Sequence, residues 1–277
     1  MTRPITTGSS VDHVDAARRG RVLGWWFFAE GRLLRERPFL GVTIATAVGN
    51  PVLYLVAMGV GLGALVQQPV DGVSYLHFVA PGLVVSTVAT TGAGWGTWPI
   101  MGGFKWERTY LAAAATAITP VQIALGELVA LGLRLLVQAA VFWAIGLAFG
   151  AWPLASAWWV VPIGAAAGLA FFAPLAAYSA TLEDEGIQFN FINRLIVMPM
   201  FLFAGTFFPL TAMPPFLQWI GWISPMWHGT QLARIASYGM ANEPLPTLGH
   251  AAFLAACIAG GMAVAARTFS RRMEKAS

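Results

Sequence analysis

The sequence predicts an all-α polytopic membrane protein with six transmembrane helices and both termini in the cytoplasm. Of its 277 residues, 57% are hydrophobic and only 10% are charged, whereas soluble domains carry about 25% charged residues. The apolar residues form long segments that are almost free of charge. Of the sixteen Lys and Arg residues, eleven lie at the two ends of the chain and most of the others lie in alternate connections, as expected for the cytoplasmic segments of membrane proteins.

Five apolar segments reach, and a sixth approaches, the length of about 20 residues that a helix needs to cross the hydrocarbon core of a bilayer. The fifth segment is short and contains Pro199 and Pro209, and proline interrupts a helix. The predicted spans are residues 41–66, 76–101, 123–149, 157–181, 195–210 and 248–268. Together they predict one transmembrane domain over residues 39–277.

The distribution of basic residues orients these spans. With the N-terminus in the cytoplasm, the cytoplasmic segments hold fourteen Lys and Arg residues, counting Arg267 at the inner end of the sixth span. The outer connections hold one, Arg234, and Arg134 lies inside a span. Because cytoplasmic loops retain basic residues, both termini are predicted to lie there. These residues flank hydrophobic segments, so they favour contact with anionic lipid headgroups over binding of nucleic acid.

The segment before the first span combines charge with aromatic residues. Residues 11–38 contain six arginines and a run of four aromatic residues at 25–28. This composition predicts an amphipathic helix in the cytoplasmic interface, with arginines toward headgroups and rings toward acyl chains. A disordered leader is the alternative for residues 11–38, and disorder is the prediction for residues 1–10.

A second irregular region lies between the fifth and sixth spans. Residues 208–239 contain four prolines and three tryptophans. The prolines divide the region into helical pieces of about one to three turns, and tryptophan favours the membrane–water boundary. This predicts a re-entrant or surface-lying helical hairpin on the outer side. Irregular backbone at membrane depth must be buried in protein or line a wet cavity, so the hairpin is a candidate for the exit end of a pathway.

The connection after the second span begins with charged and aromatic residues. Residues 104–118 continue into an alanine-rich stretch that ends at Thr119 and Pro120. The composition predicts a short helix parallel to the membrane, which would suit docking onto a cytoplasmic partner. An ordinary interfacial connector is the alternative.

Ionisable and aromatic side chains within the spans define a candidate substrate path. Glu127 and Arg134 lie two turns apart on one face of the third span. They either fix helix packing through interhelical pairing or line a polar route, and neither is placed as a proton relay at the middle of the membrane. The aromatic candidates are Tyr54, Trp95, Trp98, Phe203, Phe207 and Phe208.

The sequence contains no motif for ATP hydrolysis, metal binding or hydrolytic catalysis. Lys105 and Lys275 are the only lysines, and neither lies in a Gly-x-x-x-x-Gly-Lys-Ser/Thr loop, which cradles phosphates. The four histidines are isolated in the sequence and Cys257 is the only cysteine, so no metal site is predicted. The chain is therefore expected to have no catalytic, ATP-binding or metal-binding residues and no cofactor.

Two motifs carry a family resemblance. The first comprises Thr109-Tyr110-Leu111, Thr119-Pro120, Ile123, Gly126-Glu127-Leu128 and Arg134. The second comprises residues 203–210, 217–220 and 222–225 with Trp227, His228 and Arg234. Both resemble the membrane subunits of type-2 ABC exporters, in the branch of the nodulation-factor (lipo-oligosaccharide) and daunorubicin exporters. Tyr110 departs from this pattern, because a tryptophan is expected after the threonine.

The resemblance implies that the chain is the permease half of an ATP-driven exporter in the bacterial plasma membrane. Two copies would pair, each with a separate ATPase subunit that holds ATP and magnesium. Residues 104–118 would form the coupling helix between the second and third spans. The residues that would meet the ATPase are Lys105, Trp106, Glu107, Arg108 and Tyr110.

The sequence leaves the cargo open. The resemblance favours an amphipathic glycolipid, a lipo-oligosaccharide or a polysaccharide. A hydrophobic drug or antibiotic is the alternative, because aromatic rings along the spans could stack on sugars or on flat drugs. An ion-coupled carrier, a channel or an intramembrane enzyme is the remaining possibility.

Overall fold

The computed structural model describes residues 10–66, 68–184, 186–241 and 244–275. This part of the chain is a bundle of helices, and its only β structure is one isolated bridge between Val70 and Val73. The predicted all-α class is therefore confirmed. Of the tail predicted to be disordered, residues 1–9 lie outside the described residues.

Five helices in the described ranges are long and apolar enough to cross a membrane, one fewer than predicted. The segment predicted as the fifth span forms a shorter apolar helix at Gln188–Phe203. Its regular hydrogen bonding is interrupted by a π-helical stretch before Pro199, which has no N–H to donate. The helix ends just before Gly205, whose φ of 78° does not continue a right-handed helix.

The crossing helices are built from one or more elements. The first joins α2 (Leu40–Tyr54), the π-helical η2 (Leu55–Leu62) and α3 (Gly63–Leu65). The second joins α4 (Tyr75–Trp95) and α5 (Trp98–Lys105). The others are α7 (Pro120–Ala148), η3 (Ala155–Trp159) with α8 (Val160–Ser179), and α13 (Pro244–Glu274). The shorter apolar helix joins α9 (Gln188–Ile192), η4 (Asn193–Val197) and α10 (Met198–Phe203).

Local sequence sets the start of α7. The hydroxyl of Thr119 accepts a hydrogen bond from the backbone N–H of Gln122, whose side-chain oxygen accepts one from the backbone N–H of Thr119. Pro120 occupies the first helical position, where a missing N–H costs nothing. The Thr-Pro pair that ends the alanine-rich stretch thus begins a helix of 29 residues.

The centre of the bundle is α8, which packs against α4, α7, α13 and α12 (Pro225–Tyr238). The contact between α4 and α8 depends on glycine. A Cβ atom built on Gly92 would lie 2.1 Å from the carbonyl oxygen of Gly168, so a side chain at that position would force the helices apart. This close contact holds α4, which carries several candidate site residues, against the core.

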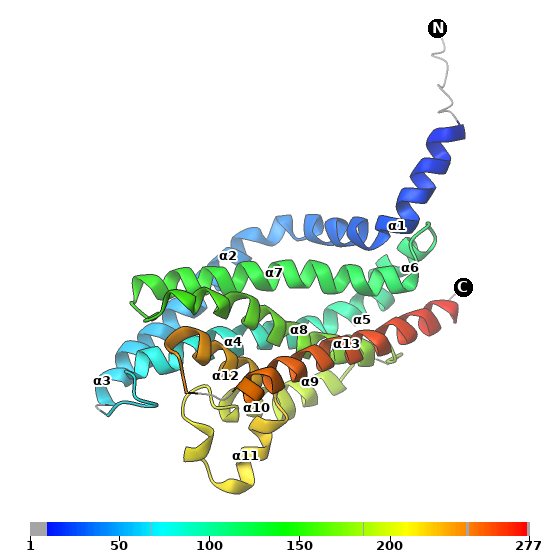
Figure 1. Ribbon diagram of the computed structural model, residues 1–277. Coiled ribbons are helices and arrows are strands. Elements are labelled where there is room, and N and C mark those ends of the chain that lie inside the picture. Colours follow the sequence, from blue (N-terminus) through cyan, green and yellow to red (C-terminus); the bar gives the residue numbers. More distant parts are fainter. Residues whose placement is uncertain (1–9, 67, 185, 242–243, 276–277) are drawn as a thin grey trace.

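The N-terminal helix α1 (Ser10–Arg35) runs beside the first half of α7 (Figure 1). A Cβ atom on Gly126 would lie 2.8 Å from the Phe28 ring, so the two helices touch closely there. The side-chain amide of Gln122 donates to the carbonyl of Arg21 at 2.7 Å. A short 3₁₀ helix, η1 (Arg37–Phe39), then leads into α2. From about Gly20 onward α1 is packed lengthwise on the bundle, whereas Figure 1 shows its N-terminal part projecting from the bundle.

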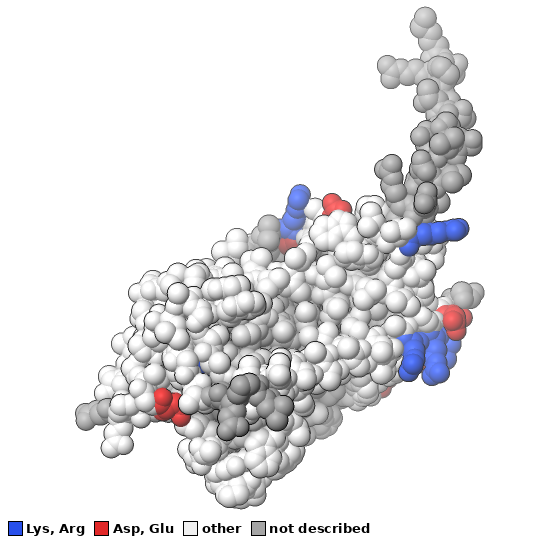
Figure 2. All heavy atoms as spheres, viewed as in Figure 1, with Lys and Arg blue, Asp and Glu red and all other residues white. Residues whose placement is uncertain are grey.

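On the face that Figure 2 shows, charged side chains lie at the margins. Figure 2 shows a broad face that is almost free of Lys, Arg, Asp and Glu. On α2, Val42, Ile44 and Leu53 are 68%, 59% and 68% exposed. A continuous apolar surface of this kind is unfavourable in water and suits hydrocarbon. The surface therefore supports a multi-pass membrane protein.

In the region predicted to form an outer hairpin, the chain folds through η5 (Leu210–Ala212), α11 (Pro215–Trp222) and α12. Figure 1 shows α11 projecting from the bundle. Ser224 caps α12 by accepting a hydrogen bond from the backbone N–H of Met226. Gly239 ends α12 with a φ of 69°, which favours glycine at a helix C-terminus.

Candidate functional site

The connection after α5 is divided into a turn and a short helix. Arg108 has a φ of 51°, in the left-handed region, and α6 (Thr109–Ala114) begins after it. A residue in this conformation interrupts a right-handed helix. The short helix expected within residues 104–118 is therefore limited to α6, which has only six residues.

We call residues 105–110 the docking loop. Trp106 is 53% exposed, and Glu107 and Arg108 are exposed as well. The Trp106 ring stacks on Trp98 with a centroid distance of 6.2 Å. The backbone N–H groups of Trp106 and Glu107 donate to the carbonyl of Gly102 at 3.1 and 2.9 Å. The loop thus presents an aromatic ring and two opposite charges on a hydrogen-bonded backbone.

Tyr110 differs from the rest of the docking loop because it points into the bundle. It is only 1% exposed, and its hydroxyl donates to Glu127 Oε1 at 2.9 Å. Its ring contacts Phe104 and Phe269 at centroid distances of 4.6 and 5.6 Å. Burial, followed by the neighbouring Glu127 carboxylate, raises the pKa of Tyr110 well above its usual value. The hydroxyl therefore stays protonated and can donate its hydrogen bond to Glu127. Through this bond Tyr110 anchors the docking loop to the core.

The two ionisable residues of α7 pair with the end of α1, and not with each other. Arg32 Nε lies 3.3 Å from Glu127 Oε1, and Arg134 Nη1 donates to Glu36 Oε2 at 2.5 Å. The Trp95 ring lies beside both arginines, 4.9 Å from Cζ of Arg32 and 4.7 Å from Cζ of Arg134. Cation–π contacts of this kind strengthen when they are shielded from water. The arrangement joins α1, α4 and α7.

A third ion pair connects this assembly to the docking loop. Arg35 Nη1 lies 3.6 Å from Glu107 Oε2, and both side chains are about half exposed. An exposed pair contributes little free energy, but it sets the position of the loop beside α1. The α1 cluster, as we name this assembly, consists of Arg32, Arg35, Glu36, Trp95, Glu107, Glu127 and Arg134.

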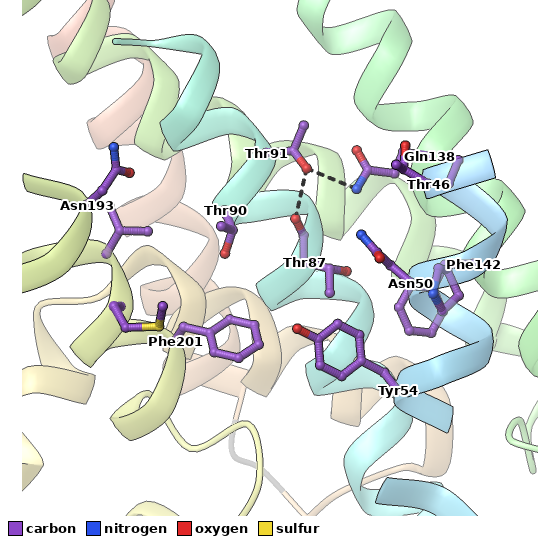
Figure 3. Close-up of a pocket in the computed structure, with 14 residues that line it drawn as sticks. Thr46, Asn50, Tyr54, Thr87, Thr90, Thr91, Gln138, Phe142, Asn193 and Phe201 are labelled. Carbon is purple, nitrogen blue, oxygen red and sulfur yellow. Dashed lines mark hydrogen bonds between the residues drawn. The ribbon is translucent and has the colours of Figure 1, made fainter. Parts of the chain in front are cut away.

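A polar cavity lies farther along the bundle, between α2, α4, α7 and η4–α10. Its volume is about 300 Å³, and Figure 3 shows its walls. Gln138 donates to the hydroxyl of Thr91 at 3.0 Å, and Thr91 donates to the carbonyl of Thr87 at 3.1 Å. The labelled residues in Figure 3 are Thr46, Asn50, Tyr54, Thr87, Thr90, Thr91, Gln138, Phe142, Asn193 and Phe201.

Aromatic rings extend from this cavity toward the hairpin. The rings of Tyr54 and Phe201 are 6.2 Å apart across the cavity, and those of Phe201 and Phe207 are 5.5 Å apart. The hydroxyl of Tyr75 donates to the carbonyl of Phe207 at 3.1 Å. Hydroxyl groups, amides and aromatic faces therefore line the cavity, and further aromatic residues adjoin it, a combination that can bind an amphipathic molecule.

Comparison with known sequences identifies the family. Residues 36–238 match the family described as ABC-2 type transporter. The chain belongs to the ABC-2 type transporter family. The matched segment contains the docking loop, the cavity and the hairpin, but it excludes α13 and all of α1. The Arg32–Glu127 pair thus joins a helix outside the matched segment to one inside it.

Individual relatives of this ABC-2 type transporter agree with the predicted branch. Nodulation protein J of Rhizobium meliloti (strain 1021) is 29% identical over 211 residues, covering 75% of this chain and 79% of the relative. Nodulation protein J of Neorhizobium galegae is 31% identical over 215 residues, covering 75% and 78%. The resemblance is therefore confirmed, including the nodulation branch, despite the departure at Tyr110. The chain is a membrane permease subunit of an ABC exporter, in a family that works with an ATP-binding subunit.

The predicted path residues of the transporter fall into separate places. Tyr54 lines the polar cavity and Phe207 lies next to it through Phe201. Trp95, Glu127 and Arg134 belong to the α1 cluster, where Glu127 and Arg134 form ion pairs between helices and do not line the cavity. The other three aromatic candidates belong to neither the cavity nor the α1 cluster. Trp98 contacts Trp106 and Phe189. Phe203 is the last residue of α10, Phe208 follows that helix, and both are half-buried.

Sequence reasoning missed most of the cavity walls. Asn50, Gln138 and Asn193 are amides within or beside apolar helices, and Thr87, Thr90 and Thr91 lie on successive turns of α4. Polar side chains inside apolar helices were the available signal. Their convergence depends on how four helices pack, which no local pattern specifies.

Two histidines that look isolated in the sequence meet in the structure. His228 Nδ1 lies 2.8 Å from His250 Nδ1, so one ring nitrogen donates and the other accepts. His228 also stacks on Phe253 at a centroid distance of 3.9 Å. This pair of histidines, which are 22 residues apart in the sequence, ties α12 to α13. The described residues contain no cluster of three or more potential metal ligands.

Proposed function

We propose that the chain exports an amphipathic glycolipid, a lipo-oligosaccharide or a polysaccharide from the cytoplasm across the bacterial plasma membrane. Two copies would form the permease, with two separate ATP-binding subunits on the cytoplasmic side and both termini of each copy on that side. The observation that carries the proposal is the similarity to nodulation protein J over about three quarters of both chains. The ATPase site and its magnesium would belong wholly to the partner subunits.

The polar cavity supports a carbohydrate-bearing cargo. Sugar hydroxyl groups both donate and accept hydrogen bonds, and the walls offer amides at Asn50, Gln138 and Asn193. Tyr54, Phe142 and Phe201 add apolar faces on the same cavity. These rings could equally take a flat drug, so efflux of a hydrophobic drug or antibiotic is the second candidate.

Tyr54→Ala is expected to lower export about tenfold, because losing an aromatic contact with the cargo costs about 1–1.5 kcal/mol. The matched control is Leu53→Ala, since Leu53 is 68% exposed and does not line the cavity. Radiolabelled sugar in the cytoplasm and in the medium would be measured in a deletion strain carrying each variant. Normal glycan export combined with new sensitivity to antibiotics in the deletion strain would favour the drug candidate instead.

The docking loop is proposed to meet the ATP-binding subunit. Replacing Glu107 and Arg108 together with alanine is expected to weaken that contact about tenfold or more, since central interface residues are each worth about 1–2 kcal/mol. ATP hydrolysis would then continue without export, while membrane insertion would be normal. Co-purification of the two subunits and cargo-stimulated ATPase activity would be measured.

A matched control separates docking from loss of charge. Glu30→Ala with Arg271→Ala removes the same two residue types from exposed positions outside the docking loop, and it should leave coupling intact. Arg35→Ala breaks the pair with Glu107 without removing an exposed residue of the loop, so a partial defect is expected. Wild-type coupling in the Glu107→Ala/Arg108→Ala variant would rule out docking through this loop.

A further inference from the structure

A groove between α2 and α7 lies next to the polar cavity but has a different character. Its volume is about 530 Å³, and it shares Thr46, Ala47, Asn50, Thr91 and Gln138 with the cavity. Its other walls are Leu33, Glu36, Arg37, Thr43, Ile44, Val48, Leu133, Arg134, Val137 and Val141. No aromatic residue lines the groove, whereas three line the cavity.

The groove is charged at one end, and aliphatic side chains run along its length, with Asn50, Thr91 and Gln138 where it borders the cavity. The Glu36–Arg134 ion pair and the exposed Arg37 lie at the start of α2. Val48 and Val141 lie deeper, and the rise of about 1.5 Å per residue places Val48 roughly 16 Å from Arg37 along the helix. The pattern matches an amphiphile with an anionic head and a hydrocarbon chain.

Arg37 makes the charged end selective for anions. It forms no ion pair or side-chain hydrogen bond with any part of the chain that the structure describes. The neighbouring Arg134 is neutralised by Glu36, so Arg37 is the cation at this end that remains available. With the N-terminus in the cytoplasm, Arg37 lies at the cytoplasmic end of the first crossing helix. Basic pockets between helices on that side of a membrane bind anionic lipid headgroups.

We propose that this groove is a binding site for an anionic phospholipid of the cytoplasmic leaflet, with its phosphate at Arg37 and an acyl chain between α2 and α7. The aliphatic wall suits a hydrocarbon chain, and the absence of aromatic rings distinguishes this site from the cavity assigned to the cargo. A resident lipid would also cover the apolar side chains of Ile44 and Val137, which are 59% and 64% exposed.

The test titrates phosphatidylglycerol and phosphatidylcholine into the purified transporter complex and counts bound lipids by native mass spectrometry. Wild type is expected to prefer phosphatidylglycerol, and Arg37→Ala to bind it about fivefold more weakly, the effect of one basic residue near an anionic surface. Arg37→Lys should retain the preference. Arg271→Ala, which removes an exposed arginine elsewhere, should match wild type.

Two further variants test whether the groove holds the acyl chain of the lipid and whether another molecule occupies it instead. Val137→Trp should fill the groove and weaken binding of both lipids. Equal phosphatidylglycerol binding in Arg37→Ala and Arg271→Ala would overturn the proposal. It would also be overturned if Val137→Cys, in a Cys257→Ser background, formed disulfide-linked dimers, because a second copy would then cover the groove. Displacement of phosphatidylglycerol by the exported glycan would overturn it as well, while leaving the proposed export function intact.

Discussion

Glu127→Ala is expected to lower the free energy of unfolding by about 3–5 kcal/mol, the usual cost of leaving one partner of a buried ion pair alone. The side chains of Arg32 and Glu127 are 12% and 2% exposed, so water cannot replace the lost carboxylate. The Tyr110 hydroxyl would lose its acceptor at the same time. Thermal unfolding of the detergent-purified complex would measure the loss, and export should fall with it because the docking loop loses its anchor.

Controls for this prediction come from the same helices. Glu30→Ala removes an exposed carboxylate from α1 and should leave the unfolding temperature nearly unchanged. Replacing Arg32 and Glu127 together with leucine should be less harmful than Glu127→Ala, because it leaves no unpaired charge. If Glu127→Ala unfolded at the same temperature as Glu30→Ala, the pair would not stabilise the α1 cluster.

Arg234→Ala is expected to release the hairpin from the bundle, with a loss of about 3 kcal/mol or more. Arg234 is 1% exposed, and it donates to the carbonyls of Gly205, Thr206 and Phe78 at 2.7, 3.3 and 3.3 Å. Its guanidinium also lies 3.7 Å from the centroid of the Phe78 ring. Each buried carbonyl left without a donor costs about 1–3 kcal/mol.

Proteolysis of the hairpin, and labelling of a cysteine introduced into it in a Cys257→Ser background, would test this role of Arg234. Both should increase in Arg234→Ala, and Arg234→Lys should give only partial protection, because a lysine cannot reproduce the planar set of donors. Gln231→Ala, one turn earlier on α12, is the matched control and should behave as wild type. Unchanged protection in Arg234→Ala would show that other contacts hold the hairpin.

The sequence was most informative where local rules act alone. Long apolar segments predicted the helices, and the prolines predicted where the region around α11 and α12 is divided. The fifth apolar helix lies at Gln188–Phe203, seven residues earlier than the predicted 195–210, because apolar composition continues past Gly205 while the helix does not. The short helix expected within residues 104–118 covers only Thr109–Ala114, and nothing in the composition indicates that Arg108 before it adopts a left-handed conformation.

Residues whose roles depend on distant partners could not be assigned from the sequence. Tyr110 belongs to a charged, exposed loop, yet it turns inward because Glu127 and Phe269 arrive from α7 and α13. Glu127 and Arg134 are unusual as ionisable residues within an apolar segment, but the sequence does not reveal their partners. These are Arg32 in α1 and Glu36 just after it, each about a hundred residues earlier in the chain. The cavity walls likewise come from four helices, so their shared location follows from packing and not from spacing.

The pairing of α1 with α7 has a consequence for the rotational setting of α2. Arg32 and Glu36 are fixed against α7, and only the 3₁₀ helix Arg37–Phe39 separates this fixed end from α2. Each residue of an α-helix turns it by about 100°, so the length of this joint determines which face of α2 meets the bundle. The rotation of α2 that brings Asn50 and Tyr54 to the cavity is therefore set by the ion pairs of Arg32 and Glu36. These residues precede Asn50 by a dozen or more positions and do not line the cavity.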